Sequence, residues 1–391
     1  MPADNRPSDP RETATGLIPF LTEYAPRHDA AGTISPEVLH RIQAEGMLRL
    51  GTPRAFGGTG ADVVTAIDVC ERLAAGCAAT SWIVGIAYGG NLLASQMSDQ
   101  VRAQIWAATP DAFVCGTANP AGTAVPIDGG WRLTGRWGWM SGINHAPWTL
   151  LGFLDDAGAA GPERRMALVS TASLEVEHTW AVAGMRGTGS DTAITDGIDI
   201  HEDQTISLEA MAAGEYRLLH PDQPRVIFHL SINLPLAGTV IGIAAAVLDA
   251  VIGRVRSGQR SSSPQHHLVA ESPSHQLAIA DAATRIDAAR LLLRRAAADV
   301  DEAAAGGRLP EPRIRTRIRA DVAFAVRTAR QAVADLLDMA GSSSFADEST
   351  MQRAWRDIET ASRHAAFSAR TNQELHGAAL LGVDLPNDPR I

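Results

Sequence analysis

Lysine is absent from this 391-residue chain, and all 34 of its basic residues are arginine. A mechanism that depends on a lysine amine, such as a pyridoxal-phosphate Schiff base or a Walker-type phosphate site, is therefore excluded. No GxGxxG fingerprint occurs, so binding of a nicotinamide dinucleotide by this chain is not indicated. The net charge of -10 argues against a general nucleic-acid surface.

Cysteine is scarce as well, and Cys70, Cys77 and Cys115 do not have the spacing of metal ligands. Cys70 and Cys77 are seven residues apart, which predicts buried thiols on one helix face. The odd number of cysteines, without a secretory signal, favours a reducing cytoplasm. The pair His266-His267 lies in a Ser- and Pro-rich loop with no partner at ligand spacing, so we predict no metal site.

Long apolar runs are also not evident, and we expect no membrane span. The N-terminus, MPADNRPSDPRETA, lacks the basic and then apolar pattern of a secretory signal. We expect residues 1–10 to form a disordered lead-in.

The hydrophobic period changes twice along the chain, which predicts three domains at 11–111, 112–222 and 223–391. The first domain reads as helices, one of which begins at Ser35-Pro36 with a serine cap. The second reads as short strands separated by turn residues. The third contains alanine-rich seams at 279–300 and 318–340, where apolar residues step by three and four. The fold class is therefore α+β and mainly α, with a helical N-terminal domain, a small central β-barrel or sandwich, and a C-terminal four-helix bundle.

The stretch GRWGWMSGINHAPW (135–148) is the richest in aromatic residues. Strand alternation predicts that Trp131, Trp137 and Trp139 share one face. Trp139 and Ser141 are two apart and are expected to point the same way. From the pattern alone, this is either an apolar strand with its turn or a wall for a planar cofactor.

Four segments, in this order, resemble the acyl-CoA dehydrogenase superfamily. They are LGTPRAFGGTGADVVTAIDVCERLA, GTANPAGTAVPIDGGWRLTGRWGWMSGINHA, GMRGTGSDTAITDGIDI, and LLDMAGSSSF followed by QRAWRDI. The glutamate that dehydrogenases carry after an Arg-Asp pair falls here on His364 and Ala365. The sequence therefore resembles the flavin-dependent monooxygenase branch, two-component hydroxylases of phenols, steroid-ring phenols, aromatic polyketides, sulfur heterocycles or amino sugars.

This resemblance implies a reaction in which reduced FMN or FAD arrives from a separate NAD(P)H:flavin reductase. O2 adds at the flavin C4a to give a hydroperoxyflavin, whose distal oxygen is transferred to an aromatic, polyketide-type or amino-sugar small molecule. The flavin carries the oxygen chemistry, while the protein holds it flat and excludes water. The resemblance also implies a homotetramer, and we expect neither nucleic acid nor membrane as a partner.

The resemblance further assigns roles to individual residues. Trp139 would flank the flavin ring, and the Ser141 hydroxyl or amide would reach N5 or O4. His364 would deprotonate a phenol or bind the flavin adduct; it lies on a polar line with Asp357, Thr360, Ser368 and Thr371, which we expect on one bundle helix. Other expected flavin contacts are Thr117, Asn119, Arg256, Arg260, Ser342 and Ser343, the arginines reaching a neighbouring subunit's site. Candidate substrate contacts are His145, Tyr88, Asn91 and Trp82.

The sequence also leaves open that the same residues have a purely structural role. Trp137 and Trp139 could both be β-domain core, and His145 could simply hydrogen-bond its turn. Two other functions also remain, an acyl-CoA dehydrogenase or desaturase with a relocated base, and a non-redox protein that keeps the fold without flavin.

Overall fold

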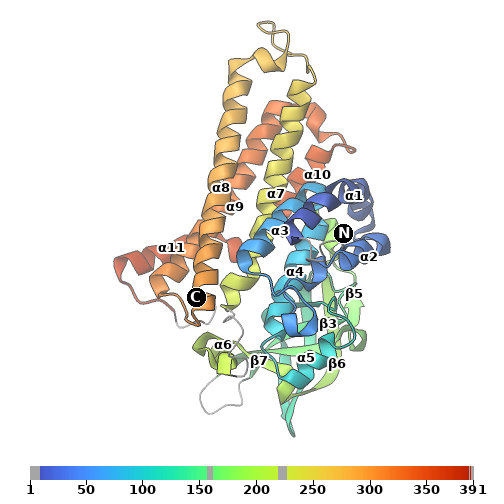
Figure 1. The fold of residues 1–391 in the computed structure, drawn as a ribbon, viewed down its shortest axis with the longest axis vertical. Coiled ribbons are helices and arrows are strands. Elements are labelled where there is room, and N and C mark those ends of the chain that lie inside the picture. The colour runs from blue at the N-terminus through green and yellow to red at the C-terminus, as the bar shows by residue number, and fades with distance from the viewer. Residues whose placement is uncertain (1–8, 156–161, 219–226, 387, 389–391) are drawn as a thin grey trace, which may run out of the picture.

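The computed structural model describes residues 9–155, 162–218, 227–386 and 388. In these residues the chain runs from helices to strands and back to helices, as the sequence predicts (Figure 1). Most of the expected lead-in lies outside the described residues, while Asp9 caps the first helix and Pro10 begins it. The N-terminal helices are α1 (Pro10–Ala31), α2 (Pro36–Ala44), α3 (Val63–Gly76), α4 (Ala78–Ala94) and α5 (Asp99–Trp106).

The predicted Ser35 cap and the burial of Cys70 and Cys77 are confirmed, but the two thiols do not share a helix face, because α3 ends at Gly76 and Cys77 is extended. The Ser35 hydroxyl accepts a hydrogen bond from the Val38 amide and so begins α2. All three cysteines are buried and free. Burial raises the pKa of the Cys70 and Cys115 thiols to about 12, which keeps them protonated and unreactive.

The strands form one seven-stranded sheet in the order β5-β6-β2-β1-β3-β4-β7. Within the described residues this sheet is open, with β5 and β7 at its edges, rather than a closed barrel. All of its pairs are antiparallel except β1 with β3. The strands are β1 (Val114–Ile127), β2 (Gly130–Met140), β3 (Trp148–Asp155), β4 (Glu163–Ser170), β5 (Glu175–Glu177), β6 (Asp191–His201) and β7 (Thr205–Ser207).

The C-terminal helices confirm both alanine-rich seams. The apolar residues predicted at 279–300 line the buried face of α8, and those at 318–340 the buried face of α9. Small side chains let these two long helices pack closely along their length. The helices are α6 (Leu208–Ala213), α7 (Phe228–Arg256), α8 (Pro273–Ala305), α9 (Pro312–Ala340), α10 (Thr350–Ala361) and α11 (Ala369–Leu381).

Helix α7 is the central helix of the molecule and packs against α3, α4, α8 and α9. Contrary to the expectation from the sequence, the segment His229–Arg256 is long and apolar enough to cross a membrane by composition alone. Its apolar surface is instead largely covered by protein, since 61% of the most apolar window is buried. This composition is that of a core helix enclosed on several sides.

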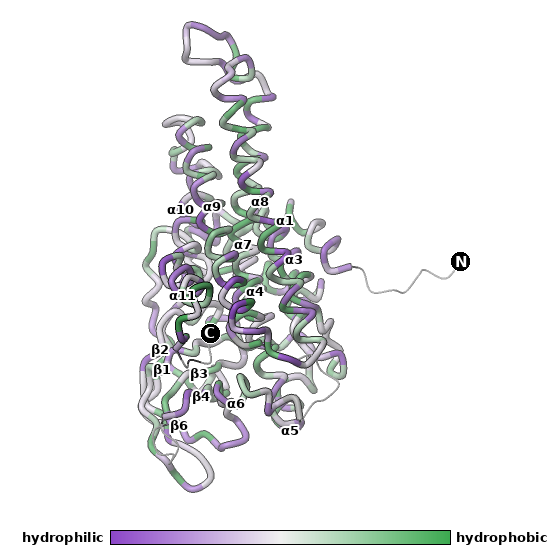
Figure 2. Tube along the Cα trace, turned by 90° about the vertical axis from the view of Figure 1, so that its left-hand side faces the viewer, coloured by the Kyte–Doolittle hydropathy of each residue, from purple (hydrophilic) through white to green (hydrophobic). Residues whose placement is uncertain are grey.

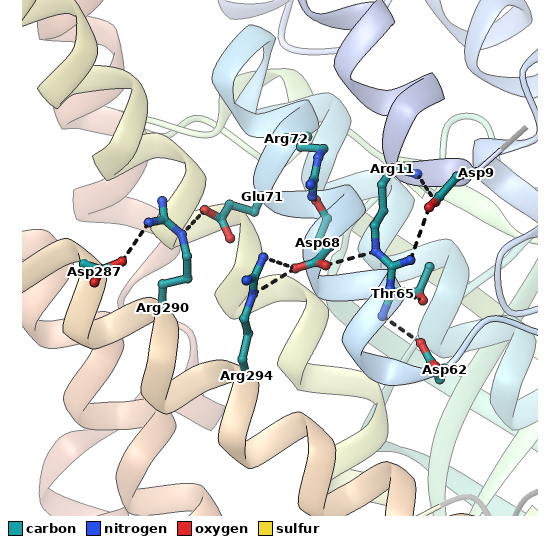
Figure 3. A network of polar contacts seen from close by, with 10 residues as sticks. All are labelled: Asp9, Arg11, Asp62, Thr65, Asp68, Glu71, Arg72, Asp287, Arg290 and Arg294. Carbon is teal, nitrogen blue, oxygen red and sulfur yellow. Dashed lines mark hydrogen bonds and ion pairs between the residues drawn. The ribbon is translucent and has the colours of Figure 1, made fainter.

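A polar network ties the N-terminal helices to the bundle (Figure 3). Asp68 on α3 is buried and receives Arg11 from α1 at 3.0 Å and Arg294 from α8 at 2.8 Å. Beside it, Arg290 of α8 binds Glu71 of α3 at 2.6 Å. These bonds fix α3 between α1 and α8, and α3 leads directly into α4, which carries part of the candidate site.

Candidate active site

Trp139 occupies a strained position at the end of β2. Its φ is +60°, although non-glycine residues rarely adopt the left-handed region. The pairing of β2 with β6 shifts register between Trp137 and Met140. As a result Trp137 is fully buried while Trp139 is 71% exposed, so the prediction that they share a face is wrong. A large aromatic ring held in solvent by a strained backbone is typical of a ligand-binding position.

Ser141 follows in the turn after β2 and points inward. The expectation that it faces the same way as Trp139 is therefore also wrong, because the strand ends at Met140. Its amide donates to the Trp139 carbonyl at 3.0 Å, so only the hydroxyl could bond a ligand. The hydroxyl accepts from Trp82 Nε1 at 3.2 Å and bonds the Ser190 hydroxyl at 2.7 Å.

His364 lies in the connection between α10 and α11, where it caps the short 3-10 helix η9 (Ala365–Phe367). The expected polar line on one helix is wrong, because α10 ends at Ala361. The His364 ring meets the Trp82 ring edge-on, with centroids 5.7 Å apart. Trp82 therefore links His364 to Ser141, and three residues predicted from the sequence come together.

The protonation of His364 follows from its surroundings. Its Nδ1 accepts a hydrogen bond from the Ala366 amide at 3.3 Å, so the neutral ring carries its proton on Nε2. Protein atoms packed around the ring desolvate it and lower its pKa to about 4, although the residue as a whole is exposed. At neutral pH the side chain is a hydrogen-bond donor rather than a base.

Carboxylates near His364 are engaged elsewhere. Buried Asp357 accepts from the Met185 amide at 2.5 Å, and desolvation raises its pKa to about 6. Glu359 forms an ion pair with Arg363 on the exposed side of α10. In the described residues both carboxylates therefore already have a bonding partner.

Thr117 and Asn119 lie where β1 leaves its neighbours. The pairing of β1 with β2 extends only as far as Gly122 opposite Gly135, and its pairing with β3 is interrupted after Thr117. Thr117 is half-buried and accepts from the Asn119 amide at 3.3 Å, while Asn119 is exposed. The two residues stay available to a ligand at the edge of this gap.

Three predicted substrate contacts have structural partners instead. Tyr88 is buried and its hydroxyl donates to the Ala61 carbonyl. Asn91 donates to Leu48 and Thr52 and accepts from the Val114 amide, which occupies its side chain. His145 Nε2 bonds the Thr33 hydroxyl at 2.9 Å, and burial lowers the pKa of His145. Each of the three side chains thus bonds other parts of the described protein.

The predicted phosphate contacts lie at the far end of the molecule. Exposed Arg256 is the last residue of α7 and exposed Arg260 lies in the α7–α8 connection, which both views place at the end of the molecule away from the strands (Figures 1 and 2). Nearby Arg254 donates to Ser343 at 2.7 Å, which gathers the exposed Ser342 and Ser343 at this end. Ser81, the neighbour of Trp82 in α4, bonds Thr239 of α7, so the end of α7 at Arg256 lies about 25 Å further along the helix. One chain does not bring them to its own Ser141.

Sequence reasoning missed Thr188 and Ser190, which the structure places beside Ser141. Ser190 bonds both Ser141 and Thr188, each at 2.7 Å. The signal was present in the segment MRGTGSD, where hydroxyl residues alternate with glycines next to a predicted strand. Among the described residues, no group of three or more His, Cys, Asp or Glu side chains could hold a metal ion.

The arrangement fits a planar flavin. The exposed Trp139 ring offers a flat apolar surface, and two residues further on, where the chain turns inward, the Ser141 hydroxyl offers a hydrogen-bonding group. The gap between β1 and β2 supplies further polar atoms, and His364 lies beyond Trp82. Such a site combines mostly apolar walls with a few placed polar groups, as small-molecule sites do.

Comparison with known proteins agrees with this geometry. Profiles of the acyl-CoA dehydrogenase N-terminal and C-terminal domains match residues 17–108 and 234–369. The oxygenase component of an FADH2-dependent resorcinol hydroxylase from Rhizobium sp. is 29% identical, over 94% of this chain and 93% of its own. The flavin-dependent monooxygenase oxygenase subunit HsaA from Rhodococcus jostii is 26% identical, over 94% and 97%.

One similar solved structure holds a reduced flavin. XiaF from Streptomyces sp., in complex with FADH2 and glycerol, is 29% identical and has a TM-score of 0.88 over 97% of both chains. The chain belongs to the acyl-CoA dehydrogenase superfamily, as the sequence predicts. Within it, the chain groups with the oxygenase components of flavin-dependent monooxygenases.

Proposed function

We propose that this protein is the oxygenase component of a two-component flavin-dependent monooxygenase that hydroxylates a phenol-type aromatic molecule. The observation that carries this proposal is His364, a neutral hydrogen-bond donor where a dehydrogenase needs a carboxylate. Relatives named as hydroxylases of resorcinol and of p-hydroxyphenylacetate support a phenolic substrate.

Each residue of the site has a part in this proposal. When bound, reduced FMN or FAD supplies the activation of O2. Trp139 would support the flavin ring, Ser141 would bond its N5 edge, and Thr117 and Asn119 would contact its pyrimidine end. His364 Nε2 donates to the substrate oxygen and thereby orients the substrate's aromatic carbon toward the flavin. Trp82 forms the wall between His364 and Ser141.

The proposal also includes partners. A separate NAD(P)H:flavin reductase delivers reduced flavin, consistent with relatives named as oxygenase components. We propose a homotetramer in the cytoplasm, in which Arg256, Arg260, Ser342 and Ser343 complete the flavin site of a neighbouring copy. Their distance from Ser141 within one chain supports this arrangement.

One experiment tests the function against its alternatives. The purified protein is supplied with reduced FMN or FAD, 18O2 and either resorcinol or p-hydroxyphenylacetate, and the product is analysed by mass spectrometry. Hydroxylated product that contains one 18O atom is expected. Reduction of bound flavin by an acyl-CoA, without a reductase, would support a dehydrogenase instead, and no binding of either flavin would support a non-redox role.

A further inference from the structure

Three buried hydroxyls form a row behind the candidate flavin face. Thr188 bonds Ser190 at 2.7 Å, and Ser190 bonds Ser141 at 2.7 Å. The exposed fractions of the three side chains are 2%, 3% and 8%, so solvent does not compete for these bonds. The row begins at the Met185 carbonyl, which accepts from the Thr188 hydroxyl at 2.8 Å.

The carbonyl fixes the direction of every bond in the row. A carbonyl oxygen only accepts, so the single hydroxyl hydrogen of Thr188 goes to Met185. The bond between Thr188 and Ser190 must then use the Ser190 hydrogen, and the next bond must use the Ser141 hydrogen. All three hydrogens point away from the flavin face and toward Met185.

Ser141 is left with only acceptor capacity for a ligand. One lone pair of its hydroxyl receives Trp82 Nε1, and its amide is already bonded to the Trp139 carbonyl. The second lone pair of the hydroxyl stays available. The Met185 carbonyl is itself held by Trp180 Nε1 at 3.0 Å, which keeps the start of the row in place.

We infer that Thr188 and Ser190 are positioning residues that hold Ser141 as a hydrogen-bond acceptor and thereby make the site select reduced over oxidised flavin. This inference rests on the proposed function. N5 of reduced flavin carries a hydrogen and can donate to Ser141, whereas N5 of oxidised flavin has only a lone pair. Two acceptors facing each other leave both unsatisfied, which disfavours the oxidised form.

The inference is tested by affinity in both redox states. Dissociation constants for FMN and FAD are measured aerobically for the oxidised form and anaerobically for the reduced form. The wild-type protein should bind the reduced form more tightly. In Thr188→Val and Ser190→Ala the Ser141 hydrogen is free to turn toward the flavin, so the ratio of the two constants should fall about three- to tenfold.

Two control variants distinguish a change in the direction of the Ser141 hydrogen bond from a general effect of removing a buried hydroxyl. Thr188→Ser keeps the hydroxyl and should retain the wild-type ratio. Thr149 of β3 has an equally buried hydroxyl, which in the described residues bonds Cys115 and Thr171. Thr149→Val removes this hydroxyl and should also retain the wild-type ratio. An unchanged ratio in both Thr188→Val and Ser190→Ala, with reduced flavin still bound, overturns the inference, as does an equal change in Thr149→Val. Failure of the wild-type protein to bind either form overturns the proposed function instead.

Discussion

His364 shows how one side chain can separate two chemistries on the same fold. Its Nδ1 is occupied by the Ala366 amide, and the surrounding protein lowers its pKa to about 4. A ring in this state donates from Nε2 and does not remove a proton from carbon at neutral pH. The residue therefore suits the binding of a substrate oxygen that remains in place during hydroxylation.

We predict that His364→Ala lowers the yield of hydroxylated product at least tenfold while oxygen consumption continues and H2O2 appears. The loss follows from the missing donor to the substrate oxygen, since the flavin site itself is unchanged. Product and H2O2 are measured together with reduced flavin in excess. His364→Gln, whose amide can donate, should recover part of the yield, and a wild-type yield in His364→Ala would remove this residue from the mechanism.

The pH profile of the wild-type enzyme gives a second prediction at this scale. Because the pKa of His364 lies at about 4, the ring stays neutral between about pH 6 and 9. The product yield per flavin oxidised should therefore be flat across that range and decline only toward pH 4. A rise in yield with an apparent pKa near 6.5 that disappears in His364→Gln would show instead that the imidazole titrates as a base.

Among the elements, α3 depends on contacts made by distant helices. Asp301 of α8 accepts from the Val63 and Val64 amides at 2.8 and 3.0 Å and so caps α3 from outside. Desolvation raises the pKa of Asp301 to about 6, from 3.8. The unfolded chain therefore loses its proton first, and the stability contribution of this carboxyl falls as pH rises from about 4 to 6.

Asp301→Asn should remove this dependence. Relative to the variant, the wild-type free energy of unfolding should fall by on the order of 1–2 kcal/mol between pH 4 and 6 and stay constant above that. Urea titrations at several pH values measure it. An opposite slope would mean that the bonds from the two amides, rather than burial, control the carboxyl.

The network around Asp68 gives an element-scale prediction of stability. Asp68→Asn should destabilise the protein by about 1–3 kcal/mol, because two arginines lose their buried partner; both retain solvent access, so the loss is smaller than for a fully buried pair. Asp287→Asn, at the exposed end of the same network, is the matched control and should change stability by less than about 0.5 kcal/mol. Equal losses in the two variants would contradict the role given to burial.

The elements also show how far sequence reasoning reaches. The seams of α8 and α9 and the Ser35 cap are local patterns, and they were predicted correctly. The outward turn of Trp139 was not predicted. It depends on a register shift in the pairing of β2 with β6, and β6 is distant from β2 in the sequence. The row from Met185 to Ser141 was missed for the same reason, since hydrogen bonds between distant segments leave no periodic signal.

At the scale of the whole molecule, the two halves of the proposed flavin site lie far apart within one chain. Trp139 and Ser141 lie at the end of β2 and His364 lies beside Trp82, whereas Arg256 ends α7 and Arg260 is in the α7–α8 connection. A symmetric assembly can join such halves, because each copy then gives to its neighbour what it receives. The proposed tetramer is therefore a condition for flavin binding as well as a state of assembly.

Co-expression of two inactive variants tests this arrangement. His364→Ala lacks the substrate donor, and the double variant Arg256→Ala/Arg260→Ala lacks the phosphate contacts. If the contacts come from a neighbour, a mixed pair contains one site with both defects and one intact site. Because half of randomly assembled pairs are mixed, about a quarter of the wild-type product should return at limiting flavin. If each chain supplies its own arginines, every site keeps one defect and co-expression restores nothing; the variants purified separately and assayed together without subunit exchange provide the baseline.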